Sequence, residues 1–405
     1  MSKRPTSAPS VPRNLRHLRL FLAVAETGSV TDAAARCHVT QPAVTQALAK
    51  LELAIGATLF ERTRQGFFAT PQGVILAERI RRALARLDPA LSDIAPRLTL
   101  TASLAQLQAL VALRETENFT LAARRLGLAQ PTVHRAITQL EQEAGRILFE
   151  RTAFGMIASR QAKTLAQAMR LALTELDQAE AELADLNGEE AGRLVIGALP
   201  LSRSVLLPQA IVEFRAARPT YPVLILDGPY DELLSGLRRG DIDLILGALR
   251  DPSPIADVVQ EPLFEDRLSI LAGRNHPFAG RADLRREDLH RCGWVVPRRG
   301  TPSREQFDAF FADLGPPASI VEAGSILLMR EILARSPLLG CISATQAQAE
   351  ISHGLLAEVP VAARWTARAI GLTRRENWHP TKAQSQMLDI LHRLARALAP
   401  KPHMK

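Results

Sequence analysis

Cysteine, aromatic residues and long apolar runs are all scarce in this 405-residue chain. The three cysteines, Cys37, Cys292 and Cys341, form no CxxC pair, which excludes a disulfide scaffold and favours a reducing compartment. His290 lies two residues before Cys292, but no second pair of ligands lies nearby, so a buried structural thiol is favoured over a metal site. No window approaches the roughly 18 uninterrupted apolar residues of a membrane span, so we expect no membrane-spanning segment.

Signals for secretion and for catalysis are also missing. Residues 1–14 are polar, basic and rich in Pro and Ser, without the apolar core of a signal peptide, so we expect a disordered arm and a cytoplasmic protein. The sequence contains no Gly-rich phosphate loop, nucleophile elbow or metal-ligand spacing. We therefore expect neither an enzyme nor a bound cofactor.

The most informative feature that is present is an internal repeat. Sliding the sequence by 89 positions aligns Gln41-Pro42 with Gln130-Pro131, and residues 59–63 with 148–152, which both read Leu-Phe-Glu-Arg-Thr. About 24 of roughly 58 aligned positions are identical, without a gap. One tandem duplication is too short for a solenoid array, so the repeated unit is predicted to be a small domain present twice.

Each copy is predicted to hold three helices and a hairpin. An apolar helical stripe is followed by a short second helix (29–36 and 118–125), a tight turn, and a third helix (40–53 and 129–143) with Pro42 or Pro131 in its first turn. Two short helices joined by a tight turn are typical of a helix-turn-helix, whose second helix enters the major groove of DNA. The Leu-Phe-Glu-Arg runs then begin a predicted β-wing, with its turn at Gly66 or Gly155.

The exposed face of the third helix and the wing supply the predicted DNA contacts. Gln is suited to adenine and Arg to guanine, whereas Thr45 and His134 are assigned to the phosphate backbone. A solvated polar face is the alternative for all of these positions. The predicted DNA-binding residues are Thr40, Gln41, Pro42, Thr45, Gln46, Lys50, Arg62 and Arg64 in the first copy, and Gln130, Thr132, His134, Arg135 and Arg151 in the second.

Charge is distributed unevenly along the chain. The formal net charge is +8, and residues 1–100 hold 14 basic and 7 acidic residues, which gives +7. Residues 166–192 hold one basic and seven acidic residues, which gives −6. The basic surplus therefore lies on the first copy, as binding to phosphates requires.

At this point the residues resemble a known family. The run Ala33-Ala34…Thr40-Gln41-Pro42-Ala43-Val44-Thr45…Leu51-Glu52…Gly56…Leu59-Phe60-Glu61-Arg62 resembles the winged helix-turn-helix of LysR-type transcriptional regulators. The resemblance extends over some sixty residues with the motifs in the family's order. The duplication departs from the single DNA-binding domain that is usual in that family.

A long amphipathic helix is predicted downstream of the second copy, from about Arg160 to Asn187. Its apolar residues alternate by four and three, as in the seam of a coiled coil, and a narrow seam favours a partner helix. LysR-type proteins have a dimerising linker helix at this point, which supports the same interpretation. An amphipathic helix packed on its own chain is the alternative. The corresponding stretch after the first copy is interrupted by Pro89 and Pro96, so we expect it to be short and to brace the second copy. The predicted dimer-arm residues are Leu165, Met169, Leu176, Leu183 and Leu186.

From Gly192 onward, strands and helices alternate, which indicates α/β lobes with parallel sheets and a cleft at the carboxyl ends of their strands. This half resembles the periplasmic-binding-protein-like effector domain of the LysR family, with landmarks at residues 240–244, 276–278 and 371–375. The stretches Gly300-Thr301-Pro302-Ser303-Arg304 and Gly371…Trp378-His379-Pro380-Thr381 are most similar to regulators of the galactose-binding-protein-regulator type.

The resemblance implies that a small-molecule effector binds between the two lobes. The loop after the first strand, Pro200–Ser204, and the helix start at Thr301–Arg304 are the matching positions. A simple helix cap is the alternative role for each hydroxyl residue. The residues implied for effector binding are Ser202, Ser204, Thr301, Ser303, Arg304 and Ser325.

The expected fold class is multidomain, with two all-α winged helix-turn-helix domains, a long linker helix and a bilobed α/β periplasmic-binding-protein-like (type 2) effector domain. The expected partners are double-stranded DNA, a second copy in a dimer or tetramer, a co-inducer of unknown identity and, as a candidate, RNA polymerase. The competing hypothesis is a small-molecule-binding protein or enzyme on the bilobed fold, with the first copy as a protein-contact module. The expected boundaries are a disordered arm (1–14), copy 1 (15–73), a short linker helix (74–97), copy 2 (98–159), a dimerisation helix (160–190) and the effector domain (191–400), whose lobe 1 covers about 191–265 and 367–400 and lobe 2 about 266–366.

Overall fold

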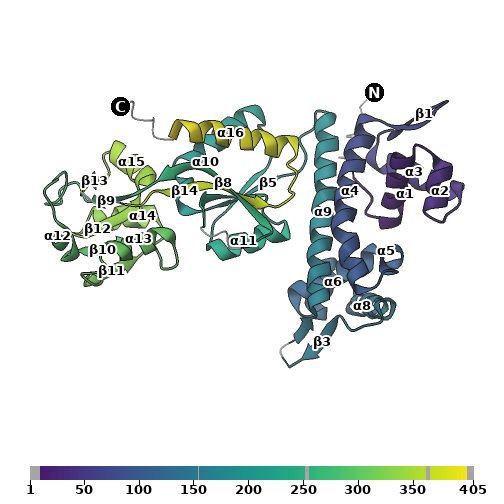
Figure 1. Cartoon of the computed structure of the whole chain (residues 1–405), viewed down its shortest axis with the longest axis horizontal. Coiled ribbons are helices and arrows are strands. Elements are labelled where there is room, and N and C mark those ends of the chain that lie inside the picture. Colours follow the sequence, from purple (N-terminus) through teal and green to yellow (C-terminus); the bar gives the residue numbers. More distant parts are fainter. Residues whose placement is uncertain (1–9, 154, 251–254, 362–364, 399–405) are drawn as a thin grey trace. The chain divides into compact units, whose positions relative to one another are not determined.

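The computed structural model of the protein describes residues 10–398, except 154, 251–254 and 362–364. The chain divides into two compact units, residues 1–192 and residues 193–405. Figure 1 shows the first unit as helical, with two small hairpins, and the second as two β-sheets covered by helices. No helix within the described residues is long and apolar enough to cross a membrane.

The first unit contains the same arrangement of elements twice, in segment 1 (residues 15–70) and segment 2 (residues 104–159). Both segments have three helices followed by a two-stranded antiparallel hairpin. Segment 1 consists of α1 (Leu15–Thr27), α2 (Val30–Arg36), α3 (Gln41–Ile55), β1 (Phe60–Thr63) and β2 (Gly66–Ala69). Segment 2 consists of α6 (Leu104–Thr116), α7 (Phe119–Leu126), α8 (Gln130–Ala144), β3 (Phe149–Thr152) and β4 (Gly155–Ala158).

Local sequence explains where these elements begin and end. Ser29 caps α2 by accepting a hydrogen bond from the Asp32 N–H, and Asn118 caps α7 in the same manner. Thr40 precedes α3, but its side chain makes no capping hydrogen bond, so it does not differ from Ala129 before α8 in this respect. Pro42 and Pro131 lie in the first turn, where a missing N–H leaves no helical bond broken.

The hairpin turns need glycine because each lies against backbone. Gly66 has a φ of +134°, and a Cβ there would lie 2.7 Å from the Gly28 carbonyl oxygen. Gly155 has a φ of +127°, and a Cβ there would lie 2.8 Å from the Glu117 oxygen. Positions 28 and 117 are also equivalent under the 89-residue shift, so both segments hold the hairpin against the end of their first helix in the same way.

The long helices α4 (Pro71–Ile94) and α9 (Arg160–Leu186) follow the hairpins and pack along each other, with the short α5 (Leu98–Thr101) after α4 (Figure 1). Pro89 does not end α4, contrary to the sequence prediction, because it lies inside a helix of 24 residues. A proline within a helix costs about 3 kcal/mol. The buried side chains of Leu84, Leu87 and Leu91 around it offset that cost.

The apolar seam of α9 is covered by its own chain, which corrects the prediction of a dimer arm. Leu165, Met169, Leu176 and Leu183 are each at most 2% exposed, and α4 is the helix packed along α9. Leu186, at the end of the seam, is 48% exposed. The heptad pattern indicated a partner helix, and that partner is provided within the same unit by the first copy's linker.

Two residues of the predicted N-terminal arm, Val11 and Arg13, contact α9. Residues 1–9 lie outside the described residues, but the next residues do not fit a disordered arm. Val11 is buried, and its N–H donates to a Glu180 carboxylate oxygen at 2.8 Å. Arg13 forms an ion pair with Asp177, also on α9. Glu180 and Asp177 of α9 therefore hold Val11 and Arg13.

The second unit contains two five-stranded sheets, one in each lobe. Lobe 1 has strand order β6-β5-β7-β14-β8 and lobe 2 has strand order β11-β10-β12-β9-β13. The lobe 1 strands are β5 (Leu194–Ala198), β6 (Val223–Leu226), β7 (Leu244–Ala248), β8 (Val258–Asp266) and β14 (Arg368–Arg375). The lobe 2 strands are β9 (Leu268–Ala272), β10 (Gly293–Val296), β11 (Ser319–Glu322), β12 (Leu339–Ser343) and β13 (Ala357–Glu358).

Both sheets are mixed rather than parallel, which corrects part of the sequence prediction. β14 runs antiparallel to β7 and β8, and β9 runs antiparallel to β12 and β13. The chain leaves lobe 1 at the end of β8, enters lobe 2 as β9, and returns as β14. Strands that cross between the lobes enter each sheet from the opposite side to the strands of its βαβ units, so they pair antiparallel.

Helices cover both faces of each sheet. In lobe 1 these are α10 (Leu206–Ala217), α11 (Tyr230–Arg239) and α16 (Lys382–Leu398), after the 3-10 turn η1 (Pro200–Arg203). Phe214 of α10 and Leu391 of α16 share a core on one face, while Leu237 of α11 is buried in the core of the other. In lobe 2 the aromatic core includes Trp294 and Phe307. The lobe 2 helices are α12 (Arg286–His290), α13 (Pro302–Phe310), α14 (Ile326–Leu333) and α15 (Ala344–Ser352).

Candidate nucleic-acid interface and effector-binding residues

The outward face of α3 presents the polar residues singled out in segment 1. Val44, Leu48 and Leu51 are buried, and this fixes which face of the helix points outward. Gln46 directly precedes the buried residues Ala47 and Leu48 but is itself exposed. Gln41 is exposed and donates to the Thr31 hydroxyl at 2.6 Å. Thr40, Pro42, Thr45 and Lys50 are also exposed.

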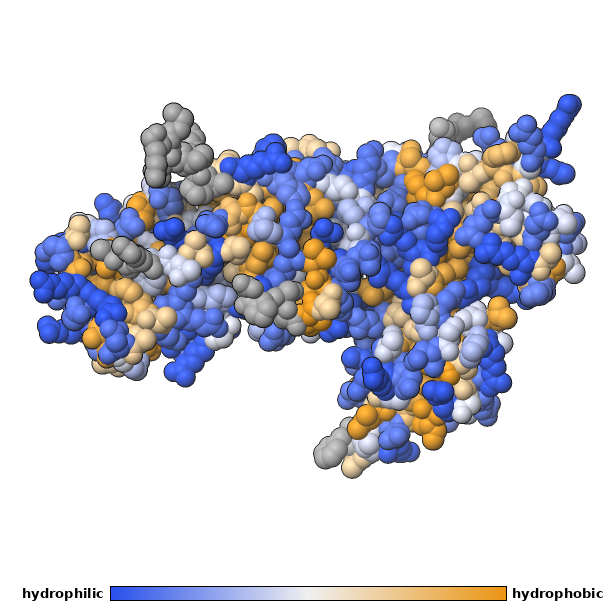
Figure 2. All heavy atoms as spheres, in the orientation of Figure 1, coloured by the Kyte–Doolittle hydropathy of each residue, from blue (hydrophilic) through white to orange (hydrophobic). Residues whose placement is uncertain are grey.

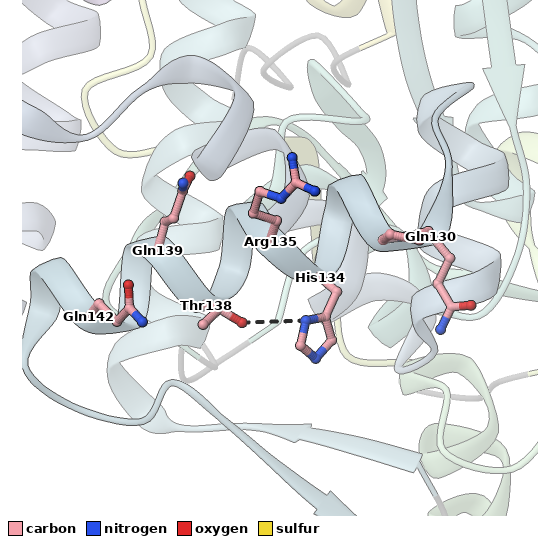
Figure 3. Close-up of a pocket in the computed structure, with 7 residues that line it drawn as sticks. Gln130, His134, Arg135, Thr138, Gln139 and Gln142 are labelled. Atoms are coloured by element: carbon pink, nitrogen blue, oxygen red, sulfur yellow. Dashed lines mark hydrogen bonds between the residues drawn. The ribbon is translucent and has the colours of Figure 1, made fainter.

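The equivalent face of α8 has a different set of side chains. Figure 3 shows Gln130, His134, Arg135, Thr138, Gln139 and Gln142, which line an open hollow along this helix. Arg135 and Thr132 are exposed. The His134 ring lies 5.1 Å from the Phe119 ring of α7, and its Nδ1 is 3.4 Å from the Thr138 hydroxyl. His134 is therefore held in place by two neighbours, whereas Arg135 projects from the helix.

The hairpins extend the basic surface beyond the third helices. Arg62 and Arg151 are equivalent residues on β1 and β3, and both are exposed, as is Arg64 at the tip of the first hairpin. The guanidinium carbon of Arg62 lies 5.9 Å from the centre of the Phe67 ring, which limits where the cation can point. Figure 2 shows the first hairpin tip as a hydrophilic projection. An exposed cation on such a projection is suited to a phosphate contact.

The electrostatic environment next to α3 is positive. His17 of α1 is half-buried, and its pKa is lowered first by burial and then by the positive charges of Lys50 and Arg16. A neighbouring anion would be favoured in such a field. This agrees with the basic surplus of the first hundred residues.

The hydroxyl residues proposed for effector binding are mostly engaged in local hydrogen bonds. Ser202 is fully buried and donates to the Leu199 carbonyl at 2.8 Å. Thr301 and Ser325 are the N-caps of α13 and α14, where they accept from the Arg304 and Leu328 N–H groups. Thr301 also donates to the Arg298 carbonyl at 2.8 Å. The cap interpretation left open by the sequence therefore describes the side chains of Thr301 and Ser325.

Arg304 is buried inside a cluster of acids. It is 4% exposed and forms ion pairs with Asp308 at 2.8 Å and Glu322 at 2.7 Å. Burial opposes its charge, but the hydrogen bonds and charges of Asp308 and Glu322 outweigh burial and raise the pKa of the guanidinium. With two carboxylates already bound, Arg304 is placed to hold the start of α13 rather than to meet a free acid.

A polar junction between the lobes contains residues that the sequence did not single out. Arg368, at the start of β14, pairs with Asp266 at 2.9 Å and contacts the Ser303 hydroxyl. The other Asp266 oxygen accepts from the Thr345 hydroxyl at 2.8 Å. Gln346 of α15 donates to the Pro200 carbonyl at 3.1 Å and to the Ser204 hydroxyl at 3.3 Å. Ser303 and Ser204 thus lie at contacts that join one lobe to the other.

The sequence carries only a weak signal for this junction. Asp266 ends β8 and Arg368 begins β14, and the two residues are direct partners in the pairing of these strands, which the sequence does not record. Gln346 follows the N-cap Ser343 by three residues, which indicates a helix start and nothing about a partner in the other lobe.

Comparisons with known proteins show the family. The model for the bacterial regulatory helix-turn-helix protein of the lysR family matches residues 15–74 and again residues 104–163. The model for the LysR substrate binding domain matches residues 187–396. The chain therefore belongs to the LysR family of transcriptional regulators, with helix-turn-helix DNA-binding and effector-binding parts.

Individual relatives agree with this assignment. The chain is 39% identical over 367 residues to the HTH-type transcriptional regulator GalR of Pseudomonas putida, covering 89% of this chain and 92% of GalR. It is 28% identical over 298 residues to the HTH-type transcriptional regulator PcaQ of Agrobacterium fabrum, covering 72% of this chain and 94% of PcaQ. The structure of a full-length OxyR variant from Pseudomonas aeruginosa shares the fold with a TM-score of 0.52 at 24% identity, over 72% of this chain and 97% of that one.

Proposed function

We propose that both segments are winged helix-turn-helix domains that bind double-stranded DNA, and that a small molecule bound between the two lobes of the second unit controls this binding. The observation that carries the proposal is the matched exposure of Gln46 and Arg135. These residues occupy equivalent positions on α3 and α8, both are exposed, and the hairpin of each segment also has an exposed arginine.

In this proposal each third helix lies in the major groove. Gln46 bonds adenine through its amide and Arg135 bonds guanine through its guanidinium, because each side chain matches the pair of groups on that base edge. Thr45 and His134 contact the sugar–phosphate backbone, and Arg62, Arg64 and Arg151 do so from the hairpins. The exposed side chains Thr40, Gln41, Lys50, Gln130 and Thr132 complete the surface.

We assign effector binding to the polar junction between the lobes. Ser204 and Ser303 are half-buried there and contact Gln346 and Arg368 respectively. A ligand that competes for these contacts would bind one lobe arrangement more strongly than another, and only such a difference in affinity shifts a conformational equilibrium. The shift then reaches transcription through DNA bending or contact with RNA polymerase.

Selection of duplexes from a random-sequence library by the purified full-length protein tests DNA recognition. We expect enrichment of a defined sequence over competitor DNA at about 0.15 M salt, where non-specific binding is weak. Arg135→Ala is expected to relax base preference at one position by about 1–3 kcal/mol. Arg62→Ala is expected to weaken binding to all duplexes alike, with a salt slope smaller by about 1. Failure to enrich any sequence would reject the proposal.

The effector is tested separately by thermal shift. The compounds to screen are the substrates of enzymes encoded beside this gene, and a ligand at 100 times its Kd is expected to stabilise the protein by about 2.7 kcal/mol. Ser303→Ala should weaken that stabilisation, whereas Ser352→Ala, on the exposed end of α15, should leave it unchanged. An equal response of both variants would place the ligand elsewhere.

A further inference from the structure

The contact between α4 and α9 contains buried charged residues. Arg79 of α4 is 4% exposed and binds Glu175 at 2.9 Å and Glu182 at 2.8 Å, with Gln178 at 2.7 Å. Burial opposes its charge, but the hydrogen bonds and charges of Glu182 and Glu175 raise the pKa of Arg79. Arg79 lies near the start of α4 and its partners lie in the second half of α9, so the two helices run antiparallel (Figure 1).

These two helices are the same element of the repeat. The 89-residue shift that superposes the segments carries Pro71, the first residue of α4, onto Arg160, the first residue of α9. Each helix is held to its own segment by equivalent ion pairs, because Glu26 contacts Arg81 and Glu115 contacts Arg170. An antiparallel pair of equivalent helices places the two segments about an approximate twofold axis within one chain.

The charges on that axis differ between the copies. Arg86 of α4 and Glu175 of α9 are equivalent positions, and they lie 3.6 Å apart. Pairing α9 with α9 of another chain would bring Glu175 against Glu175, and pairing α4 with α4 would bring Arg86 against Arg86. The α9 equivalent of Arg79 is Ala168, so a pair of α9 helices would also lack the cation that binds Glu175 and Glu182. Like charges in a buried contact are strongly unfavourable, so the charges select the α4–α9 pair.

The two segments that this pair carries also differ on their outward faces. Gln46 corresponds to Arg135, Thr45 to His134 and Ala43 to Thr132. Gln and Arg at one position match adenine and guanine respectively. Two segments related by a twofold axis but with different outward side chains require a DNA site with two inverted half-sites of different sequence.

We propose that one chain is a complete two-headed DNA-binding unit, in which the α4–α9 pair presents segments 1 and 2 to two unlike half-sites of one asymmetric operator. This inference rests on the proposed function, since it assumes that both segments bind DNA. The partner at the site is a duplex with an adenine-centred half and a guanine-centred half. The partner helix that the apolar seam of α9 requires is thereby supplied inside a single chain.

The test uses full-length protein and the duplex enriched from the random library. We expect two unlike half-sites. Gln46→Ala should lower base discrimination roughly 5- to 150-fold in one half only, and Arg135→Ala in the other half only. A symmetric selected site, with Gln46→Ala indistinguishable from the unaltered protein, would overturn the inference in favour of pairing between two copies of segment 2.

Mixing the two variants separates pairing within a chain from exchange between chains. Gln46→Ala and Arg135→Ala chains carrying different tags are co-expressed, and binding of the mixture to the operator is titrated by footprinting. If α4 and α9 pair within one chain, every pair of DNA-binding segments contains one substituted segment. We therefore expect no fraction of the mixture to bind with the affinity of the unaltered protein. If α4 of one chain paired with α9 of another, some pairs would combine two intact heads, and a high-affinity fraction would overturn the inference.

Failure of the proposed function gives a different result. If neither segment binds DNA specifically, the library yields no enriched duplex and the mixing experiment has no target. If only segment 2 binds, a sequence is enriched but contains a single half-site or a symmetric pair. The inference is therefore contradicted by an enriched site of the wrong symmetry, and the proposed function by the absence of any enriched site.

Discussion

Replacing Arg79 by Ala removes the cation from the α4–α9 contact and leaves its two carboxylates behind. The side chain of Glu175 is 5% exposed and that of Glu182 is 21% exposed, so neither regains full hydration. Removing one partner of a buried ion pair costs about 3–5 kcal/mol because a charge stays buried without compensation. Arg86 remains 3.6 Å from Glu175 and compensates part of the loss. We therefore expect the lower end of that range, about 3 kcal/mol.

Urea unfolding followed by far-ultraviolet circular dichroism measures this cost. With a slope of about 2 kcal/mol/M, a loss of about 3 kcal/mol moves the transition of the first unit by about 1.5 M. The second unit lies outside the contact, and its transition is expected to stay in place. Arg82→Ala is the matched control, because Arg82 is on the same helix and forms an outward pair with Glu78. Such surface pairs contribute about 0–1 kcal/mol.

A second variant tests whether the cost comes from uncompensated charge or from lost packing. Replacing Arg79, Glu175 and Glu182 together by Met, Leu and Leu removes both signs at once and keeps side-chain volume. Fully apolar replacements of buried ion pairs are often neutral or stabilising. We expect this triple variant to recover most of the stability lost by Arg79→Ala. If Arg79→Ala cost no more than Arg82→Ala, the α4–α9 contact would not depend on its buried charges and the selection of partners by charge would be refuted.

Three further predictions concern the second unit. Burial raises the pKa of the Asp243 carboxyl, although the hydrogen bond from the Val195 N–H and the charge of Arg375 oppose the shift. The stabilisation from this shift is therefore fully present below the ordinary pKa of 3.8, and it is lost as pH rises through the higher pKa of the folded state. The measurement compares the free energy of unfolding of the unaltered protein with that of Asp243→Asn. The difference, unaltered minus variant, should fall as pH rises from the ordinary pKa of the carboxyl toward neutrality. A difference that does not change with pH would contradict this prediction. Burial also raises the pKa of Cys341 to about 12, so at about pH 8 only about one thiol in 10⁴ is ionised, and mass spectrometry should find Cys341 unalkylated by iodoacetamide until the protein unfolds. Gln346→Ala removes a hydrogen bond between the lobes, about 1 kcal/mol, so amide hydrogen exchange in residues 199–205 should rise about fivefold, and an unchanged rate would show that this contact does not hold the loop.

Local sequence rules were sufficient for the two helix-turn-helix segments. Pro42 and Pro131 fixed the start of the third helices, and Gly56 and Gly145 fixed their ends, because each of these residues acts through its own backbone geometry. The hairpin turns at Gly66 and Gly155 follow from the same kind of constraint. Exposure of Gln46 and Arg135 follows from helical spacing alone, once the buried stripe is known.

Tertiary contacts decided the remaining elements. Pro89 is unfavourable inside a helix, but α4 continues through it because the long contact with α9 contributes more than one lost hydrogen bond and the local strain. Likewise, the mixed sheets and the Asp266–Arg368 pair arise from strands that cross between the lobes, and no window of sequence records which strand will lie beside which. The effector residues were predicted by resemblance, and only Ser204 and Ser303 lie at contacts between lobes.

The partner helix of α9 could have been inferred from the sequence, but from its charged residues rather than from its apolar heptad pattern. A heptad seam requires an apolar partner helix but does not distinguish between a second copy of α9 and a different helix. The distinction lies in the polar residues on the same face. Arg79 and Arg86 in the first copy face Glu175 and Glu182 in the second, and the 89-residue shift shows that positions 86 and 175 are equivalent. Opposite charges at an equivalent position favour pairing between the copies and oppose pairing of either helix with itself. A duplicated chain whose copies diverge in this way makes its linker-helix contact without a second molecule, so the relative placement of segments 1 and 2 does not depend on protein concentration.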